Sequence, residues 1–296
     1  MRQLVQVGCT VVAAWAMFGA ALPVRAADQA QIERGEMLFN VAGCVTCHTD
    51  EKGGGQALAG GRAIETPFGR FYGPNITADR QNGIGAWSEA EFRRALREGI
   101  GRNGAYLFPV FPYTSFTGMS DGDIADLYAY LESRPAVAQA NKPHEVKAPF
   151  GWRFLLVFWR KLYFREGPLQ AVAGQSAEWN RGRYLAEAVV HCQECHTPRN
   201  FLGALDHAKA YSGNPQAPDG QKVPNITPDT ETGIGKMSVE EITQVLETGK
   251  APFGDVEKGM AEIVKGTAKL SSEDRHAIAI YIKSLPAIYT PKKPSS

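Results

Sequence analysis

Two pentapeptides of one pattern constrain the fold and the chemistry of this chain more than any other feature. They are Cys44-Val45-Thr46-Cys47-His48 and Cys192-Gln193-Glu194-Cys195-His196, and a threonine follows each. In a C-x-x-C-H segment, two thiols can bond the two vinyl groups of one porphyrin, and the adjacent imidazole can bind its iron. The pattern therefore predicts two covalently attached c-type haems. The predicted haem-binding residues are Cys44, Cys47 and His48, and Cys192, Cys195 and His196, with the two histidines as proximal iron ligands.

A four-cysteine zinc ribbon is the main alternative for the two cysteine pairs. It would require the pairs to converge from opposite halves of the chain, whereas zinc ribbons usually place their pairs much closer in sequence. A disulfide framework is a weaker alternative still. The histidine that follows both pairs favours haem. The fifth cysteine of the sequence, Cys9, lies outside both motifs.

The N-terminal segment has the pattern of a secretory signal peptide. A basic start, Met1-Arg2, precedes a mostly apolar stretch from Val11 to Leu22, and small residues follow at Ala26-Ala27. We expect residues 1–27 to be removed and the protein to be exported. A retained membrane anchor is the alternative, but the apolar stretch is shorter than the roughly 20 residues that span a bilayer.

An internal repeat predicts the domain organisation. Arg34-Gly35 recurs as Arg181-Gly182, and Pro74-Asn75-Ile76-Thr77 recurs as Pro224-Asn225-Ile226-Thr227, with offsets that drift only from 147 to 151 residues along the chain. Such collinearity indicates a duplicated haem domain. We expect one domain over residues 28–138, called here the first repeat, a linker over 139–175, and a second domain over 176–296, the second repeat. The net charge of +1 and the hydrophobic content of 44% are those of an ordinary globular chain and do not indicate a nucleic-acid partner.

Each repeat predicts the same order of helices. A helix precedes the haem motif, a long loop rich in Gly, Pro and Asn follows, and a second helix begins at Ser88, where Glu91 completes a capping box. A closing helix begins at Ser120. The second repeat has the same signals at Ser238, Glu241 and Ser271. The expected fold is therefore all-α, and the order of elements resembles the mono-haem cytochrome c fold used twice.

The sixth iron ligand has no local motif, but a thioether is the expected soft partner. Of the methionines that follow the signal segment, Met37 lies too close to its haem motif and Met237 sits at the start of a helix, so both favour core packing. Met119 and Met260 remain as the predicted distal ligands. They are not repeat equivalents, because the local offset places Met260 opposite residues 109–111. His144 and His207 are the alternatives if a methionine fails.

Two prolines have a predicted supporting role. A carbonyl at Pro74 or Pro224 can accept the Nδ1 proton of a proximal histidine and fix its ring. A recurrent turn is the alternative explanation for the repeated Pro-Asn-Ile-Thr segment.

Several longer motifs carry a resemblance to a known family. They are G-C-x-x-C-H-T, T-P-F-G-x-x-Y-G-P-N-I-T, G-I-G-x-W-S, F-P-Y-x-S-F and D-x-A-D-L-Y-A-Y-L. The chain resembles the cytochrome c subunits of bacterial periplasmic alcohol, gluconate and aldehyde dehydrogenases. The resemblance implies a periplasmic carrier that passes electrons from a dehydrogenase to a soluble cytochrome or terminal oxidase. Two departures are evident: those subunits commonly hold three haems, and Phe111 occupies a place where they often have methionine.

The predicted linker contains an aromatic and basic segment, residues 151–164, that is too short to span a bilayer. It suits either a surface that docks a partner or a membrane, or a helix packed between the two domains. We favour the packed helix. For the whole chain, a di-haem enzyme such as a peroxidase or a thiosulfate-oxidising cytochrome is the alternative to an electron carrier.

Overall fold

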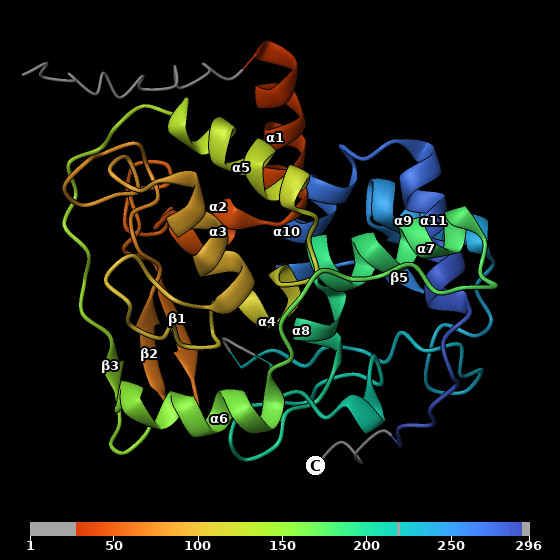
Figure 1. The fold of residues 1–296 in the computed structure, drawn as a ribbon. Helices are drawn as coiled ribbons and strands as arrows, with labels where there is room; N and C mark the ends of the chain where they lie inside the picture. Colours follow the sequence, from red (N-terminus) through yellow and green to blue (C-terminus); the bar gives the residue numbers. More distant parts are fainter. Residues whose placement is uncertain (1–27, 218–219, 292–296) are drawn as a thin grey trace, which may run out of the picture.

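The computed structural model describes residues 28–217 and 220–291 (Figure 1). The predicted signal peptide, residues 1–27, lies outside these ranges. The first repeat contains the helices α1 (Gln29–Val41), α2 (Cys44–His48), α3 (Glu89–Glu98), α4 (Tyr113–Phe116) and α5 (Asp121–Glu132) and the strands β1 (Ala63–Thr66) and β2 (Gly69–Tyr72).

The remaining elements follow in chain order. The linker contains β3 (Glu145–Val146), the 3-10 turn η1 (Arg153–Leu155) and α6 (Leu156–Tyr163). The second repeat contains α7 (Ala177–Tyr184), the π-helical turn η2 (Leu185–Val189), α8 (Cys192–His196), the 3-10 turn η3 (His207–Lys209), α9 (Val239–Thr248), β4 (Lys250–Ala251), β5 (Gly254–Asp255), α10 (Lys258–Thr267) and α11 (Ser272–Lys283).

The predicted helix starts are confirmed. Before α3, the Ser88 side chain accepts a hydrogen bond from the backbone N–H of Glu91, and the Glu91 carboxylate accepts one from the backbone N–H of Ser88. Ser238 and Glu241 form the same capping box before α9. These bonds satisfy amides that the first turn of a helix leaves unpaired.

Each repeat closes with the same helix crossing. Helix α1 packs on α5, and α7 packs on α11. A Cβ added at Gly35 would lie 2.0 Å from the carbonyl oxygen of Asp126, and one added at Gly182 would lie 1.9 Å from that of Ala277. Only glycine permits backbones this close, so the repeated Arg-Gly dipeptides mark the two crossing points.

The all-α expectation is incomplete, because the structure also contains small sheets. Strands β1 and β2 pair antiparallel with Ile64 opposite Phe71, and β3 pairs with β2. The β1–β2 turn is held by Thr66, whose hydroxyl donates to Gly69 O at 2.7 Å. A second, two-stranded sheet joins β4 and β5. These strands have two to four residues, too short to give a clear period-two pattern in the sequence.

Helix α6 lies beneath the β1–β2 hairpin in Figure 1 and contacts both repeats. Arg160 donates to the carbonyl of Glu98, at the end of α3, while Trp159 Nε1 donates to the carbonyl of Leu202 at 2.9 Å. The buried core is continuous between the repeats and includes Leu38 and Ile124 as well as Leu185 and Ile278. Within the described residues, no helix combines the length and apolar character needed to cross a membrane.

Candidate haem site

Both predicted proximal histidines are fixed by the prolines that the sequence indicated. Nδ1 of His48 lies 2.7 Å from Pro74 O, and Nδ1 of His196 lies 2.8 Å from Pro224 O. Because a carbonyl only accepts, each Nδ1 carries a proton, and Nε2 is left as the nitrogen that can bind a metal. Burial lowers the pKa of both imidazoles, against the effect of the carbonyl, and so favours the neutral form that a metal requires.

The four motif thiols lie in the wall of one cavity. Burial raises the pKa of Cys44 and Cys192 to about 12 and that of Cys195 to about 11. Before they bond a porphyrin, these thiols are therefore protonated near neutral pH. Over residues 28–217 and 220–291, no group of three or more His, Cys, Asp and Glu side chains is arranged to hold a metal ion. The zinc-ribbon alternative has no support there.

The cavity is shared by both repeats and has a volume of about 3290 Å³. A typical small-molecule pocket has about 300–1,000 Å³, so this one has room for more than one large group. Its walls include Phe92, Leu96 and Leu131 from the first repeat and Ile242 and Ile282 from the second. An apolar space with a neutral imidazole and two thiols at each motif fits a porphyrin that is bonded to the chain and bound through its iron.

The segments directly before the two motifs are in contact. Nε2 of His191, the residue before Cys192, lies 3.2 Å from the carbonyl oxygen of Ala42, which lies two residues before Cys44. His191 has a φ of 47°, a left-handed backbone that is costly for a residue other than glycine. Cys47 also lies close enough to Cys195 to help raise the pKa of its thiol, after burial and Glu194. A contact of this kind joins distant parts of the chain, and no sequence signal pointed to it.

The two predicted distal methionines lie in different surroundings in the structure. Met260, in the first turn of α10, lines the cavity that His48 and His196 also line. Met119 is fully buried in the core, at 0% exposure, and is not among the residues that line the cavity. The predicted pairing of Met119 with the His48 iron is therefore not supported by where its side chain lies. Met119 lies two residues before the first residue of α5, and there its side chain packs into the core.

The other residues considered as iron ligands also differ in whether they line the cavity. Met237 lines the cavity and donates its backbone N–H to Ile234 O at 3.0 Å, as Trp87 does to Ile84 O at 2.8 Å. Met237 and Trp87 therefore form equivalent parts of the cavity wall in the two repeats. His144 also lines the cavity, and its Nδ1 accepts the backbone N–H of Tyr72 at 3.2 Å. His207 is exposed and is not among the lining residues.

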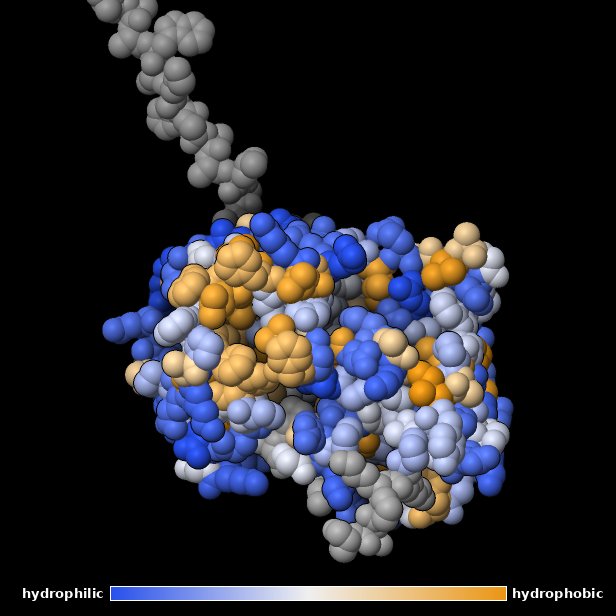
Figure 2. All heavy atoms as spheres, turned by 90° about the horizontal axis from the view of Figure 1, so that it is seen from below, coloured by the Kyte–Doolittle hydropathy of each residue, from blue (hydrophilic) through white to orange (hydrophobic). Residues whose placement is uncertain are grey.

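The rim of the cavity carries exposed apolar side chains. Figure 2 shows apolar residues gathered on the lower face of the molecule, which α6 crosses in Figure 1. Those on and before α6 are called here the exposed apolar face: Phe150 (42% exposed), Trp152 (53%), Phe154 (63%), Phe158 (61%) and Leu162 (70%). Phe150, Trp152, Phe158 and Leu162 also line the cavity. The cavity therefore reaches the surface through this face.

Helical repeats around a cavity with two C-x-x-C-H motifs define a c-type cytochrome. The family described as Cytochrome c matches residues 32–135. The chain is 40% identical over 265 residues to a diheme cytochrome c-type protein of Cereibacter sphaeroides, with 87% of each chain covered. The chain belongs to the diheme c-type cytochromes and carries covalently bound haem with iron.

Two further relatives are subunits of larger proteins. The gluconate 2-dehydrogenase cytochrome c subunit of Pantoea cypripedii is 39% identical, with 90% of this chain and 62% of that subunit covered. The fructose dehydrogenase cytochrome subunit of Gluconobacter japonicus is also 39% identical, with 88% and 54% covered. The chain thus spans little more than half the length of these subunits. The resemblance to dehydrogenase cytochrome subunits is confirmed.

Proposed function

We propose that this protein is a periplasmic di-haem electron carrier that accepts electrons from a dehydrogenase and passes them to a soluble cytochrome or a terminal oxidase. The observation that carries this proposal is the paired arrangement of the motifs, which line one cavity and whose preceding residues, His191 and Ala42, are in contact. The names of the relatives, as cytochrome subunits of dehydrogenases, support the electron donor.

The proposal assigns one haem to each repeat, in two domains over residues 28–138 and 176–296 with a linker between them. In each, the motif thiols attach the porphyrin and the histidine binds iron. When bound, the haem supplies a one-electron couple, and the protein controls it through ligand identity and burial. The thioether of Met260, in the same cavity as His196, is proposed to close the sixth position of that iron and raise its reduction potential.

Peptide mass spectrometry and protein-film voltammetry test this function. Tryptic peptides that contain Cys44–His48 and Cys192–His196 are each expected to carry the mass of one haem. The loaded protein is expected to show two reversible one-electron couples. Met260→Leu is expected to lower the potential of one couple only. A single haem, or no reversible couple, would contradict the assignment.

A di-haem enzyme is the alternative function. Protein-film voltammetry also distinguishes an electron carrier from such an enzyme. A peroxidase gives a catalytic current with hydrogen peroxide, and a thiosulfate-oxidising cytochrome gives one with thiosulfate. We expect neither reagent to give a catalytic current with this protein.

Export to the periplasm and peripheral association with a membrane are further parts of the proposal. The exposed apolar face supports the second, because aromatic side chains near basic ones suit a bilayer interface. Co-sedimentation with vesicles of phosphatidylethanolamine and phosphatidylglycerol tests it, and Phe158→Ser is expected to reduce the bound fraction. N-terminal sequencing of the exported protein tests removal of residues 1–27.

A further inference from the structure

In each repeat, a loop that follows a helix reaches the cavity. The two loops can be aligned because each contains an equivalent backbone hydrogen bond. Gly99 caps the C-terminus of helix α3 and Gly249 caps that of helix α9, both with left-handed backbone. The Gly99 carbonyl accepts the backbone N–H of Leu107 at 2.8 Å, and the Gly249 carbonyl accepts that of Val256 at 2.8 Å. Four residues beyond this bond stands Phe111 in the first repeat and Met260 in the second.

Phe111 and Met260 therefore occupy corresponding places. Both are partly buried, and both line the cavity. A thioether can bind iron, whereas a phenyl ring has no lone pair to offer. The Phe111 ring instead packs against Phe116, with ring centroids 5.6 Å apart.

Met119 corresponds to a leucine of the second repeat. Its backbone N–H donates to Phe116 O at 3.0 Å, just as that of Leu270 donates to Thr267 O at 3.1 Å. Both side chains are buried, at 0% and 4% exposure, and each stands directly before the capping serine of the closing helix. The position of Met119 is therefore a core position in both repeats.

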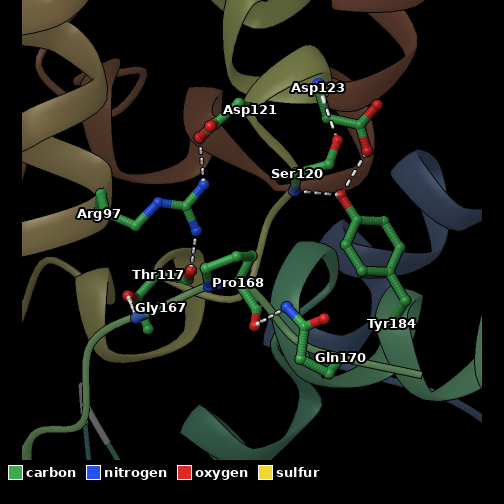
Figure 3. Close-up of polar contacts among 9 residues, drawn as sticks. All are labelled: Arg97, Thr117, Ser120, Asp121, Asp123, Gly167, Pro168, Gln170 and Tyr184. Carbon is green, nitrogen blue, oxygen red and sulfur yellow. Dashed lines mark hydrogen bonds and ion pairs between the residues drawn. The ribbon is translucent and has the colours of Figure 1, made fainter. Parts of the chain in front are cut away.

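Polar contacts hold the backbone on either side of Met119, and Figure 3 shows those of Thr117 and Ser120. Arg97 donates to the Thr117 carbonyl and pairs with Asp121 at 2.6 Å. On the other side, the Ser120 N–H donates to the hydroxyl of Tyr184 at 3.0 Å. Between them, the Gly118 carbonyl accepts the backbone N–H of Leu169 at 3.0 Å. Carrying Met119 into the cavity would break these bonds, which hold its backbone to α3, to the linker and to the second repeat.

We propose that the His48 iron has an open sixth position, which binds a small uncharged diatomic ligand such as carbon monoxide or nitric oxide, while Met260 closes the His196 iron. This inference rests on the proposed haem attachment at both motifs. The cavity near Phe111 is lined by Leu107, Phe108 and Val110 and suits an uncharged ligand. No protein ligand has to leave when the lone pair of such a molecule bonds to ferrous iron.

The experiment is a titration of the fully loaded, reduced protein with carbon monoxide, followed by the Soret band. We expect saturation at one carbon monoxide for every two haems. Met260→Leu is expected to raise the count to two, because it opens the second iron. Phe111→Met is expected to abolish binding to the reduced protein. In the oxidised variant, the near-infrared band of methionine-ligated ferric haem is expected to double in intensity.

Met119→Leu is the matched control, because leucine is the residue that the second repeat has at this place. It is expected to leave the count at one. If the wild type binds no carbon monoxide, the proposal is wrong, and a count of one in Met119→Leu or in His144→Gln would then identify the ligand. A count of two in the wild type would also overturn it.

The proposed function and this inference fail in distinguishable ways. If both peptides carry the mass of a haem and two reversible couples are seen, but no carbon monoxide binds, only the inference of an open position is contradicted. Missing haem on either peptide removes the assignment on which both rest. If Phe111→Met does not fold, the numbers of carbon monoxide molecules bound by the wild type and by Met260→Leu still test the proposal.

Discussion

At the scale of single residues, Glu194 joins the second haem motif to the first repeat. Its carboxylate accepts hydrogen bonds from the hydroxyls of Thr114 and Ser115, both at 2.9 Å, and pairs with Arg199 at 2.5 Å. The first motif has Thr46 at the corresponding place. Burial alone would raise the pKa of Glu194, but the charges of Arg199 and His191 and the hydrogen bonds outweigh it and hold the pKa below its usual range.

We expect Glu194→Gln to lower the free energy of unfolding by about 2 kcal/mol at pH 7, because it removes the charge with which the buried Glu194 carboxylate binds the half-buried Arg199 and two hydroxyls. A carboxyl whose pKa is lowered by folding stabilises the protein above its unfolded pKa, about 4.3, and loses this effect as the pH falls through the folded value. The difference between wild type and variant should therefore shrink below about pH 4. Urea unfolding at pH 7 and at pH 3.5 measures it, and an equal difference at both values would contradict the assignment of charge.

At the scale of elements, the repeated helix crossings depend on one glycine each. We expect Gly182→Ala to destabilise the protein by about 1–3 kcal/mol, since the new methyl group would force α7 away from α11. Gly122→Ala, in α5, is the matched control, because the nearest atom to its Cβ is Ser120 Oγ at 3.9 Å. It should be neutral or slightly stabilising. Thermal unfolding of both loaded variants checks this, and similar losses in the two would rule out the crossing as the cause.

The elements also show what the sequence can predict. Helix starts at Ser88 and Ser120 depend on bonds within four residues, so local patterns are sufficient to predict them. The carbonyl at Pro74 was predicted because the repeat marked it twice. Met119 was placed at the iron by elimination among methionines, whereas the packing of α4 and α5 puts it in the core. The contact of His191 with Ala42 joins residues 149 positions apart, and neither residue has a local signal for it.

At the scale of the whole molecule, the two repeats interlock. A Cβ at Gly266 of α10 would lie 2.3 Å from the carbonyl oxygen of Asn40 in α1, and Lys269 Nζ donates to the side chain of Asn40 at 2.8 Å. The core runs through both repeats without a break. The repeats should therefore unfold together.

A variant that lacks one attachment site tests this cooperation. We expect Cys192→Ala/Cys195→Ala to lower the denaturant midpoint of the remaining haem in the first repeat, although its own motif is intact. The absorbance of that haem, compared with tryptophan fluorescence, gives the measurement. An unchanged midpoint for the first haem would mean that the repeats are independent.

The shared cavity also bears on how the protein is made. A chain loaded at one motif only would keep half of the cavity wall, including Ile242 and Ile282, without a porphyrin to cover it. Such a half-finished chain would present apolar surface and loosely held loops to the proteases around it. Because one cavity serves both motifs, proteolysis would remove the incompletely loaded molecules and spare the completed ones.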